Sequence, residues 1–142
     1  MTPPAVRRVL VGGACLVATT VVSGCGSNRA GDVQTVASQF YDAVAAQHGA
    51  DACALLAPPT RSGVEQSEEK HCPAAIVAAG LKPAGGVEEV KVYGTMAQVR
   101  WDADVTFLTR YDVGWRVLAA GCSMPPPSQR TAEHYDCAVE AG

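Results

Sequence analysis

The hydrophobic pattern of this 142-residue chain changes once, at the pair Gly85-Gly86. Before the pair, over residues 32–79, apolar residues recur at helical spacing. After it, over residues 87–121, short segments are rich in valine, threonine and aromatic residues. Helices followed by consecutive strands predict an α+β fold, in which the helices cover one face of an antiparallel sheet. The length suits a single domain of this kind.

Three helices are predicted before the glycine pair, over residues 33–48, 52–57 and 73–79. Asp32 is a suitable N-cap for the first helix, whose apolar stripe begins at Val33. The prolines Pro58-Pro59 are expected to stop the second helix. The polar segment 60–71 is expected to form a turn of helix and a loop.

About four strands are predicted after the glycine pair, over residues 87–93, 96–101, 105–111 and 115–121. Their connections are short enough for hairpins, so the strands should form a meander. The tail, residues 123–142, begins with three consecutive prolines, which favour a stiff extended linker. We therefore place the folded domain at residues 32–122 and expect the tail to be held by Cys137.

The first 24 residues read as a cleaved signal peptide. Arg7 and Arg8 precede a charge-free run, Val9 to Val22, which as a helix would reach roughly 21 Å. This is shorter than the ~30 Å hydrocarbon core of a bilayer, so a short transmembrane anchor is the less favoured alternative. The paired arginines leave general secretion and twin-arginine export both open.

The segment Val22-Ser23-Gly24-Cys25 resembles the lipobox of bacterial lipoproteins. The resemblance implies cleavage between Gly24 and Cys25, lipid attachment to Cys25, and a location on the extracytoplasmic face of the cell membrane. Residues 25–31 would then be a lipidated, flexible tether. Several acyl chains on one cysteine would hold the protein firmly, because each buried methylene contributes about 0.8 kcal/mol.

The charge of the chain argues against nucleic-acid binding. The formal net charge of −3 becomes −5 once Arg7 and Arg8 are removed with the leader. A phosphate-binding surface needs the opposite sign. An acidic domain is also repelled by anionic headgroups, so its membrane attachment is expected to come from the lipid.

Four cysteines remain once Cys15 leaves with the leader and Cys25 is lipidated: Cys53, Cys72, Cys122 and Cys137. Outside the cytoplasm an even set predicts two disulfides, for which three connectivities exist. We favour Cys53–Cys72, which joins two helices, and Cys122–Cys137, which clips the tail to the last strand. The alternative is a zinc site that includes His71 and His134, but the chain has no Cys-x-x-Cys pair, and no metal is predicted.

No catalytic constellation is found in the sequence. It lacks a phosphate-binding glycine loop and a nucleophile elbow, so we assign no cofactor and no catalytic residue. Asp102 and Asp104 are explained as turn residues. Four aromatic residues are the candidates for lining a ligand pocket, if the domain has one: Tyr41, Trp101, Phe107 and Tyr111.

The chain resembles the NTF2-like (cystatin-type) superfamily, and within it small actinobacterial lipoproteins of uncharacterised function. The resemblance rests on five segments: Phe40-Tyr41, Cys53 to Leu56, Cys72 to Ile76, Gly114 to Val117, and Gly121-Cys122. It implies a cone in which a curved sheet and its helices enclose an apolar pocket. Some members are isomerases or dehydratases that use Asp, His or Tyr there, and many only bind. No histidine falls in a predicted strand, so the resemblance implies a fold and not an activity.

Two functions from different classes follow from this pattern. The favoured one is a membrane-anchored, non-catalytic module that binds an apolar small molecule or a protein partner. The alternative is a small isomerase- or hydrolase-type enzyme at the cell envelope, for which Asp42 and Tyr111 are the candidate residues.

Overall fold

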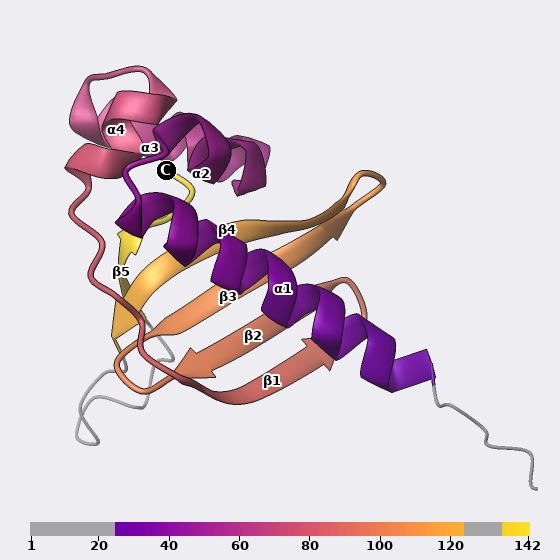
Figure 1. The fold of residues 1–142 in the computed structure, drawn as a ribbon. Helices are drawn as coiled ribbons and strands as arrows, with labels where there is room; N and C mark the ends of the chain where they lie inside the picture. Colours follow the sequence, from indigo (N-terminus) through magenta and orange to yellow (C-terminus); the bar gives the residue numbers. More distant parts are fainter. Residues whose placement is uncertain (1–24, 124–134) are drawn as a thin grey trace, which may run out of the picture.

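The computed structural model describes residues 25–123 and 135–142. Its elements are α1 (Cys25–Ala45), α2 (Gly49–Leu55), α3 (Pro58–Glu68), α4 (Cys72–Ala78), β1 (Val87–Tyr93), β2 (Met96–Trp101), β3 (Val105–Tyr111), β4 (Gly114–Ser123) and β5 (Asp136–Val139). The strands form one antiparallel sheet in the order β1-β2-β3-β4-β5. Helix α1 crosses one face of this sheet, and α2, α3 and α4 gather in a second group above β4 (Figure 1).

The α+β class is confirmed, and so are the first three strands with the bounds predicted for them. Alternating burial marks β2, in which Ala97, Val99 and Trp101 are buried. The fourth strand is longer at both ends than predicted, because it continues to Ser123 beside β5. The predicted leader, residues 1–24, lies outside the described residues, as do the three prolines of the tail.

The sheet has five strands where about four were predicted. Residues 136–139 of the predicted tail form β5, in which Cys137 lies opposite Cys122 of β4. This short strand pairs with β4 and thereby places Val139 in the core. Of the two outer strands, β5 has only four residues, and the pairing of β1 with β2 is irregular between Val87 and Glu89.

Helix α1 begins at Cys25, so residues 25–31, which were expected to form a flexible tether, are helical. Asp32 lies inside the helix and is not its N-cap. Val33 is fully buried, which means that the chain is already packed on the sheet at this point, and the helix continues past it toward the N-terminus. Gly31 is exposed, and its carbonyl accepts a 2.9 Å hydrogen bond from the Thr35 hydroxyl.

The prolines Pro58-Pro59 start a helix instead of only ending one. They occupy the first turn of α3, where a missing N–H costs nothing, and α3 runs on to Glu68. The expectation of a single helical turn and a loop over residues 60–71 is therefore wrong. The residue that caps its C-terminus, Glu69, adopts a left-handed conformation with a φ of 50°. The predicted helices over 52–57 and 73–79 appear as α2 and α4, each beginning earlier.

The main hydrophobic core lies between α1 and the sheet. Phe40 and Val33 from α1 are fully buried, and they pack with Leu108 and Val117 from the sheet. The opposite face of the sheet carries a smaller cluster, formed by Val105, Ala119 and Cys122 and covered by Phe107, Tyr135 and Cys137.

A bulge in β4 attaches the helical group to the sheet. Leu108 pairs with Val117 but the preceding Phe107 pairs with Ala119, so Leu118 is the extra residue. The amide of Ala57 donates to the Val117 carbonyl at 2.8 Å, and the buried Thr60 hydroxyl donates to the Leu118 carbonyl at 2.7 Å. The start of α3 thus satisfies carbonyl groups that the bulge takes out of the ladder.

Both disulfides have the pairing that the sequence favoured. Cys53–Cys72 joins α2 to the first residue of α4. Cys122–Cys137 links the facing residues of β4 and β5. The first therefore holds the helical group together, and the second holds the short outer strand in the sheet.

Candidate functional site

Two of the four aromatic residues proposed for a pocket are packed against each other in the core. Tyr41 of α1 and Trp101 of β2 meet edge to face, with their ring centroids 5.4 Å apart. Their exposed fractions are only 8% and 6%. Both rings therefore fill space between α1 and the sheet, and the rings of Phe40 and Tyr41 also meet edge to face, with their centroids 5.4 Å apart.

The other two aromatic residues lie elsewhere. Phe107 projects from the opposite face of the sheet and meets Tyr135, with ring centroids 4.9 Å apart. Tyr111 lies at the end of β3 and is 37% exposed. The four side chains are therefore not brought together in one pocket.

The Tyr41 hydroxyl belongs to a buried polar chain. The Trp101 Nε1 donates to the Thr106 Oγ1 at 2.9 Å, and the Thr106 and Tyr41 hydroxyl oxygens are 3.5 Å apart. The amide of Gly121 donates to the Tyr41 hydroxyl oxygen at 3.1 Å. This series of hydrogen bonds leads from the core to the surface, where the Gly121 amide also donates to the Asp104 carboxylate.

Asp104 is the carboxylate that the sequence interpretation missed. It follows the β2–β3 turn, and its two oxygens accept hydrogen bonds from the amides of Cys122, at 2.7 Å, and Gly121, at 3.2 Å. Burial raises the pKa of the Asp104 carboxyl above its usual value, and the amides of Cys122, Gly121 and Val105 offset this only in part. The sequence shows only an Asp-Ala-Asp turn, because the partners of Asp104 lie in β4.

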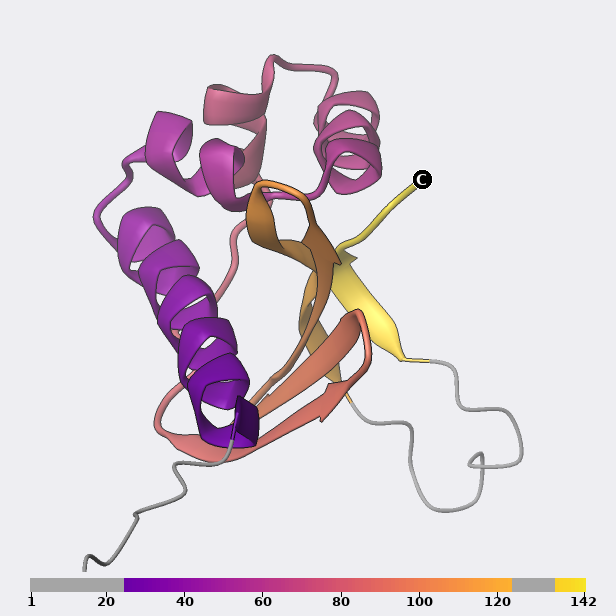
Figure 2. The ribbon, with the colours of Figure 1, turned by 90° about the vertical axis from the view of Figure 1, so that its right-hand side faces the viewer.

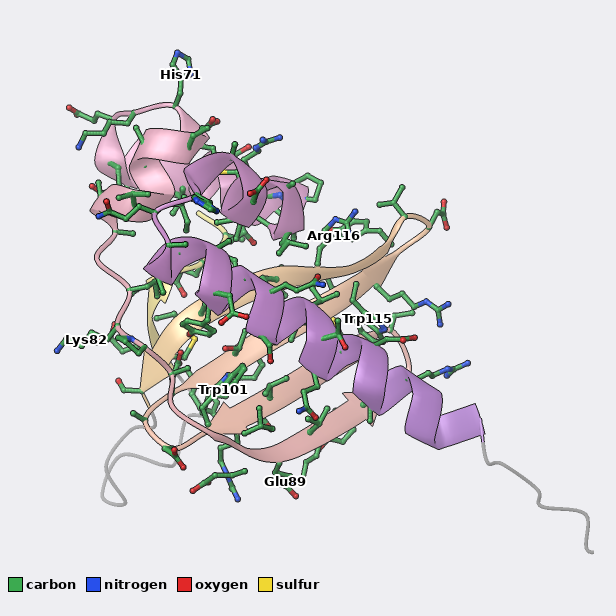
Figure 3. All side chains as sticks on the ribbon, in the orientation of Figure 1. His71, Lys82, Glu89, Trp101, Trp115 and Arg116 are labelled. Atoms are coloured by element: carbon green, nitrogen blue, oxygen red, sulfur yellow. A yellow bond between two sulfur atoms is a disulfide. The ribbon has the colours of Figure 1, made fainter. Side chains whose placement is uncertain are left out.

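Asp104 lies in a surface groove of about 400 Å³, which we call the Asp104 groove. Its lining comes from the loop before β1, the β2–β3 turn and the β4–β5 edge: residues 80–83, 103–104, 121–123 and 138. Lys82 is the basic side chain of this lining, and it extends outward on the same side of the molecule as Trp101 (Figure 3). A second depression of about 300 Å³, lined by Glu88 and Arg100 among others, shares Asp104 with it.

The groove is suited to binding more than to proton transfer. The Asp104 oxygens already accept backbone amides, and this fixes the geometry of β4 at Gly121. The groove residues combine one carboxylate, one ammonium and short apolar side chains. The carboxylate can bind a positively charged group of a ligand, and the ammonium can bind a negatively charged one. A peptide or protein surface presents such mixed chemistry.

The enzyme candidates lie apart from this groove. Asp42 is exposed and lines a depression of about 510 Å³ between α1 and α2, together with His48 and Asp51. The His48 Nδ1 and the Asp51 Oδ2 are 3.8 Å apart, and both side chains are largely exposed. Tyr111, the second candidate, lies in the β3–β4 hairpin.

Within residues 25–123 and 135–142, no cluster of three or more His, Cys, Asp or Glu side chains is arranged to hold a metal ion. No helix in this described part of the chain has the length and apolar character needed to span a bilayer. Cys25 is the first residue of α1, whereas Gly24, on the other side of the predicted cleavage site, lies outside the described residues. Comparisons of the chain with protein families, with curated proteins and with solved structures found no match.

Proposed function

We propose that the protein is a lipoprotein, anchored through Cys25 on the extracytoplasmic face of the cell membrane, that acts as a non-catalytic interaction module. The anchor is proposed from the basic start, the apolar run and the lipobox-like segment that ends at Cys25. The two disulfides are compatible with it, because structural disulfides persist in oxidising compartments.

Of the two kinds of ligand, we favour a protein or peptide partner over an apolar small molecule. One observation carries this choice: Tyr41 and Trp101, the core aromatics expected to line a pocket, are over nine-tenths buried against each other and their neighbours. The partner face that we propose is the Asp104 groove, whose lining contains one carboxylate, Asp104, and one ammonium group, Lys82.

We also propose that the domain is of the NTF2-like type. Its support is a long N-terminal helix packed across one face of an antiparallel sheet, followed in sequence by short helices and then the strands. The observed bulge at Leu118 is the kind of feature that bends a sheet around a helix.

The alternative function is a small envelope enzyme of the isomerase or hydrolase type. The observation that favours it is the half-buried Asp104 carboxyl, whose pKa is raised. Asp42 and Tyr111, the residues first considered for this role, are both exposed and belong to different elements. An enzyme would therefore have to use Asp104, which the binding proposal uses as a recognition group.

The anchor is tested by lipid labelling of the full chain in a bacterial host. Wild-type protein should incorporate radiolabelled palmitate, and the signal-peptidase inhibitor globomycin should make the lipidated, unprocessed precursor accumulate. The Cys25→Ala variant should take up no label, with Cys15→Ala as the matched control that still does. Labelling of the Cys25→Ala chain would contradict the proposal.

The partner face is tested by photo-cross-linking in intact cells. A photo-reactive amino acid replaces either Ser123, an exposed residue of the Asp104 groove, or Lys70, an exposed lysine beyond the end of α3. We expect a discrete adduct from position 123 that is lost in the Asp104→Asn background, and none from position 70. Equal adducts from both positions, or none from position 123, would refute this face.

A further inference from the structure

The large apolar side chains that are exposed in the described residues all lie in two hairpins. Tyr93 and Met96 flank the β1–β2 turn and are 61% and 40% exposed, and Tyr111 and Val113 lie at the β3–β4 turn, 37% and 74% exposed. The two turns are neighbours, because the Arg110 amide donates to the Thr95 carbonyl at 2.8 Å. Exposed apolar residues gathered in this way mark an interaction surface.

Helix α1 starts at the same end of the molecule. Figure 2 looks onto this end, with the start of α1 low in the view and the tips of the β1–β2 and β3–β4 hairpins above it. A shallow groove of about 320 Å³ separates the two, lined by Asp32 and Thr35 of α1 and by Val113 and Arg116 of the β3–β4 hairpin among others. The hairpin end, as we call the exposed residues of 29–36, 93–96 and 110–116, comprises this groove and the two neighbouring hairpin turns.

The apolar run of the sequence lies just before the start of α1, and a membrane that holds this run would lie next to the hairpin end. The run ends at Val22, and α1 begins at Cys25. The membrane attachment therefore lies within a few residues of the start of α1, because an extended residue spans at most about 3.6 Å. This holds whether the attachment is a lipid on Cys25 or the apolar run itself.

The charges of the hairpin end suit an anionic lipid surface. Its charged residues are Arg29, Arg110 and Arg116 against Asp32 and Asp112, which gives this region a formal charge of 3 − 2 = +1 in a chain whose net charge is −3. Among the residues whose positions are described, none of the three arginines has a carboxylate within ion-pair distance. Arg100, by contrast, is paired with Glu88 at 3.1 Å. Figure 3 shows Arg116 and Trp115 on the hairpin side, away from Lys82 and Trp101.

We propose that the hairpin end is a membrane-docking surface, with Tyr93, Met96, Tyr111 and Val113 entering the headgroup region and the three arginines facing anionic phosphates. Tyrosine suits this location because its ring is apolar and its hydroxyl stays hydrated. Basic residues near an anionic leaflet are attracted to it, although the domain as a whole is acidic. The proposal rests on the proposed anchor, and it makes the anchored domain stand in one orientation.

This orientation places the Asp104 groove away from the membrane. The β1–β2 turn and the β2–β3 turn lie at opposite ends of β2, and Asp104 follows the second of them. A domain that docks through its hairpins would therefore present the groove to the space beyond the bilayer.

The test uses tryptophan quenching by brominated lipids. The full-length chain, purified from bacterial membranes, is reconstituted into vesicles of phosphatidylethanolamine and phosphatidylglycerol, with and without bromine on the acyl chains. The variant Val113→Trp adds a reporter at the β3–β4 turn, and Ala103→Trp adds a matched reporter at the exposed β2–β3 turn. The fluorescence of wild type, which contains Trp101 and Trp115, is subtracted from both.

We expect the added fluorescence of Val113→Trp to be lost in brominated vesicles and that of Ala103→Trp to be retained. If the protein stays with the vesicles but Val113→Trp is not quenched, the docking surface is refuted and the anchor is supported. The exposed apolar residues of the hairpins would then be assigned to a protein partner. If the chain does not stay with the vesicles, both proposals fail. Equal quenching of the two reporters would also overturn the orientation.

Discussion

At the scale of single residues, the Asp104 side chain connects the β2–β3 turn to strand β4. Its carboxylate accepts the amides of Gly121 and Cys122, where β4 leaves the regular ladder. Gly121 has a φ of 66°, and a Cβ there would lie 2.9 Å from the Cβ of Ala138, which cannot rotate away. Glycine is thus required at this position by conformation and by space.

The raised pKa of Asp104 predicts a stability that depends on pH. Because the folded-state pKa lies above the ordinary value of 3.8, the folded domain holds this proton more tightly than the unfolded chain does. The stabilising contribution is therefore present below 3.8 and is lost as the pH rises through the folded-state pKa. Urea unfolding of wild type and Asp104→Asn across this range should show wild type losing free energy of unfolding relative to the variant. If the difference in free energy of unfolding between wild type and Asp104→Asn does not change with pH, the raised pKa of Asp104 is contradicted.

Thr60 offers a second prediction for a single residue. Its hydroxyl is the buried donor to the Leu118 carbonyl, so Thr60→Val leaves that carbonyl without a partner and should lower the free energy of unfolding by about 1–3 kcal/mol. Thr60→Ser keeps the hydroxyl and removes one methyl group, and it should cost about 1 kcal/mol. Urea denaturation measures both. A valine variant as stable as wild type would show that the carbonyl finds water.

The residues of the candidate site could be predicted only in part. Tyr41 and Trp101 were recognised as important aromatics, but nothing in the spacing of residues 41 and 101 shows that the two rings meet. Asp104 was interpreted as a turn residue, which it also is. Its bonds to β4 arise from tertiary structure, and the local sequence contains no sign of them.

At the scale of elements, the sequence predicted the strands well where alternation and turns agree, as in β1, β2 and β3. Strand β5 could not be predicted, because four residues are too few to show an alternating hydrophobic pattern. They form a strand because they pair with β4 and because the disulfide at Cys137 holds them there. Pro58-Pro59 were misleading in another way, since proline both ends one helix and starts the next.

The contact between α2 and α4 gives a prediction about elements. Gly49 begins α2 and is buried, and a Cβ on it would overlap the backbone carbonyl of Pro73 in α4. Gly49→Ala should therefore push the two helices apart and lower the free energy of unfolding by about 1–3 kcal/mol. Gly31→Ala is the matched control: its Cβ meets nothing within 4 Å, and alanine should stabilise α1 by about 0.5–1 kcal/mol. Equal effects of the two in urea denaturation would argue against the close contact.

At the scale of the whole molecule, one core unites the helical group with the sheet. Cys53 and Cys72 are buried in the same cluster as Phe40 of α1 and Val99 and Trp115 of the sheet. The helices over residues 49–78 therefore share their interior with the rest of the domain and are not a separate unit. What holds them is packing in addition to the disulfide.

Removal of Cys53–Cys72 should accordingly destabilise the domain without dividing it. The paired variant Cys53→Ala/Cys72→Ala is expected to lose about 3 kcal/mol, the amount typical of a closed loop of this size. Far-ultraviolet circular dichroism reports mainly the helices, and the fluorescence of Trp101 and Trp115 reports the sheet. The two urea transitions should coincide. A helical transition that precedes the fluorescence change would show that helical structure unfolds before the sheet does, and would contradict this prediction.

The outer strands of the sheet decide whether neighbouring copies in one bilayer can associate through their strand edges. Confining a protein to two dimensions raises its local concentration, and an open strand edge then invites pairing with a neighbouring copy. Here one edge is irregular at Val87 and Glu89 and carries the charged side chains of Glu88 and Lys91, and the other is only four residues long and bound by a disulfide. Both edges are poor templates for a further strand, so crowded copies of this domain should stay separate from one another.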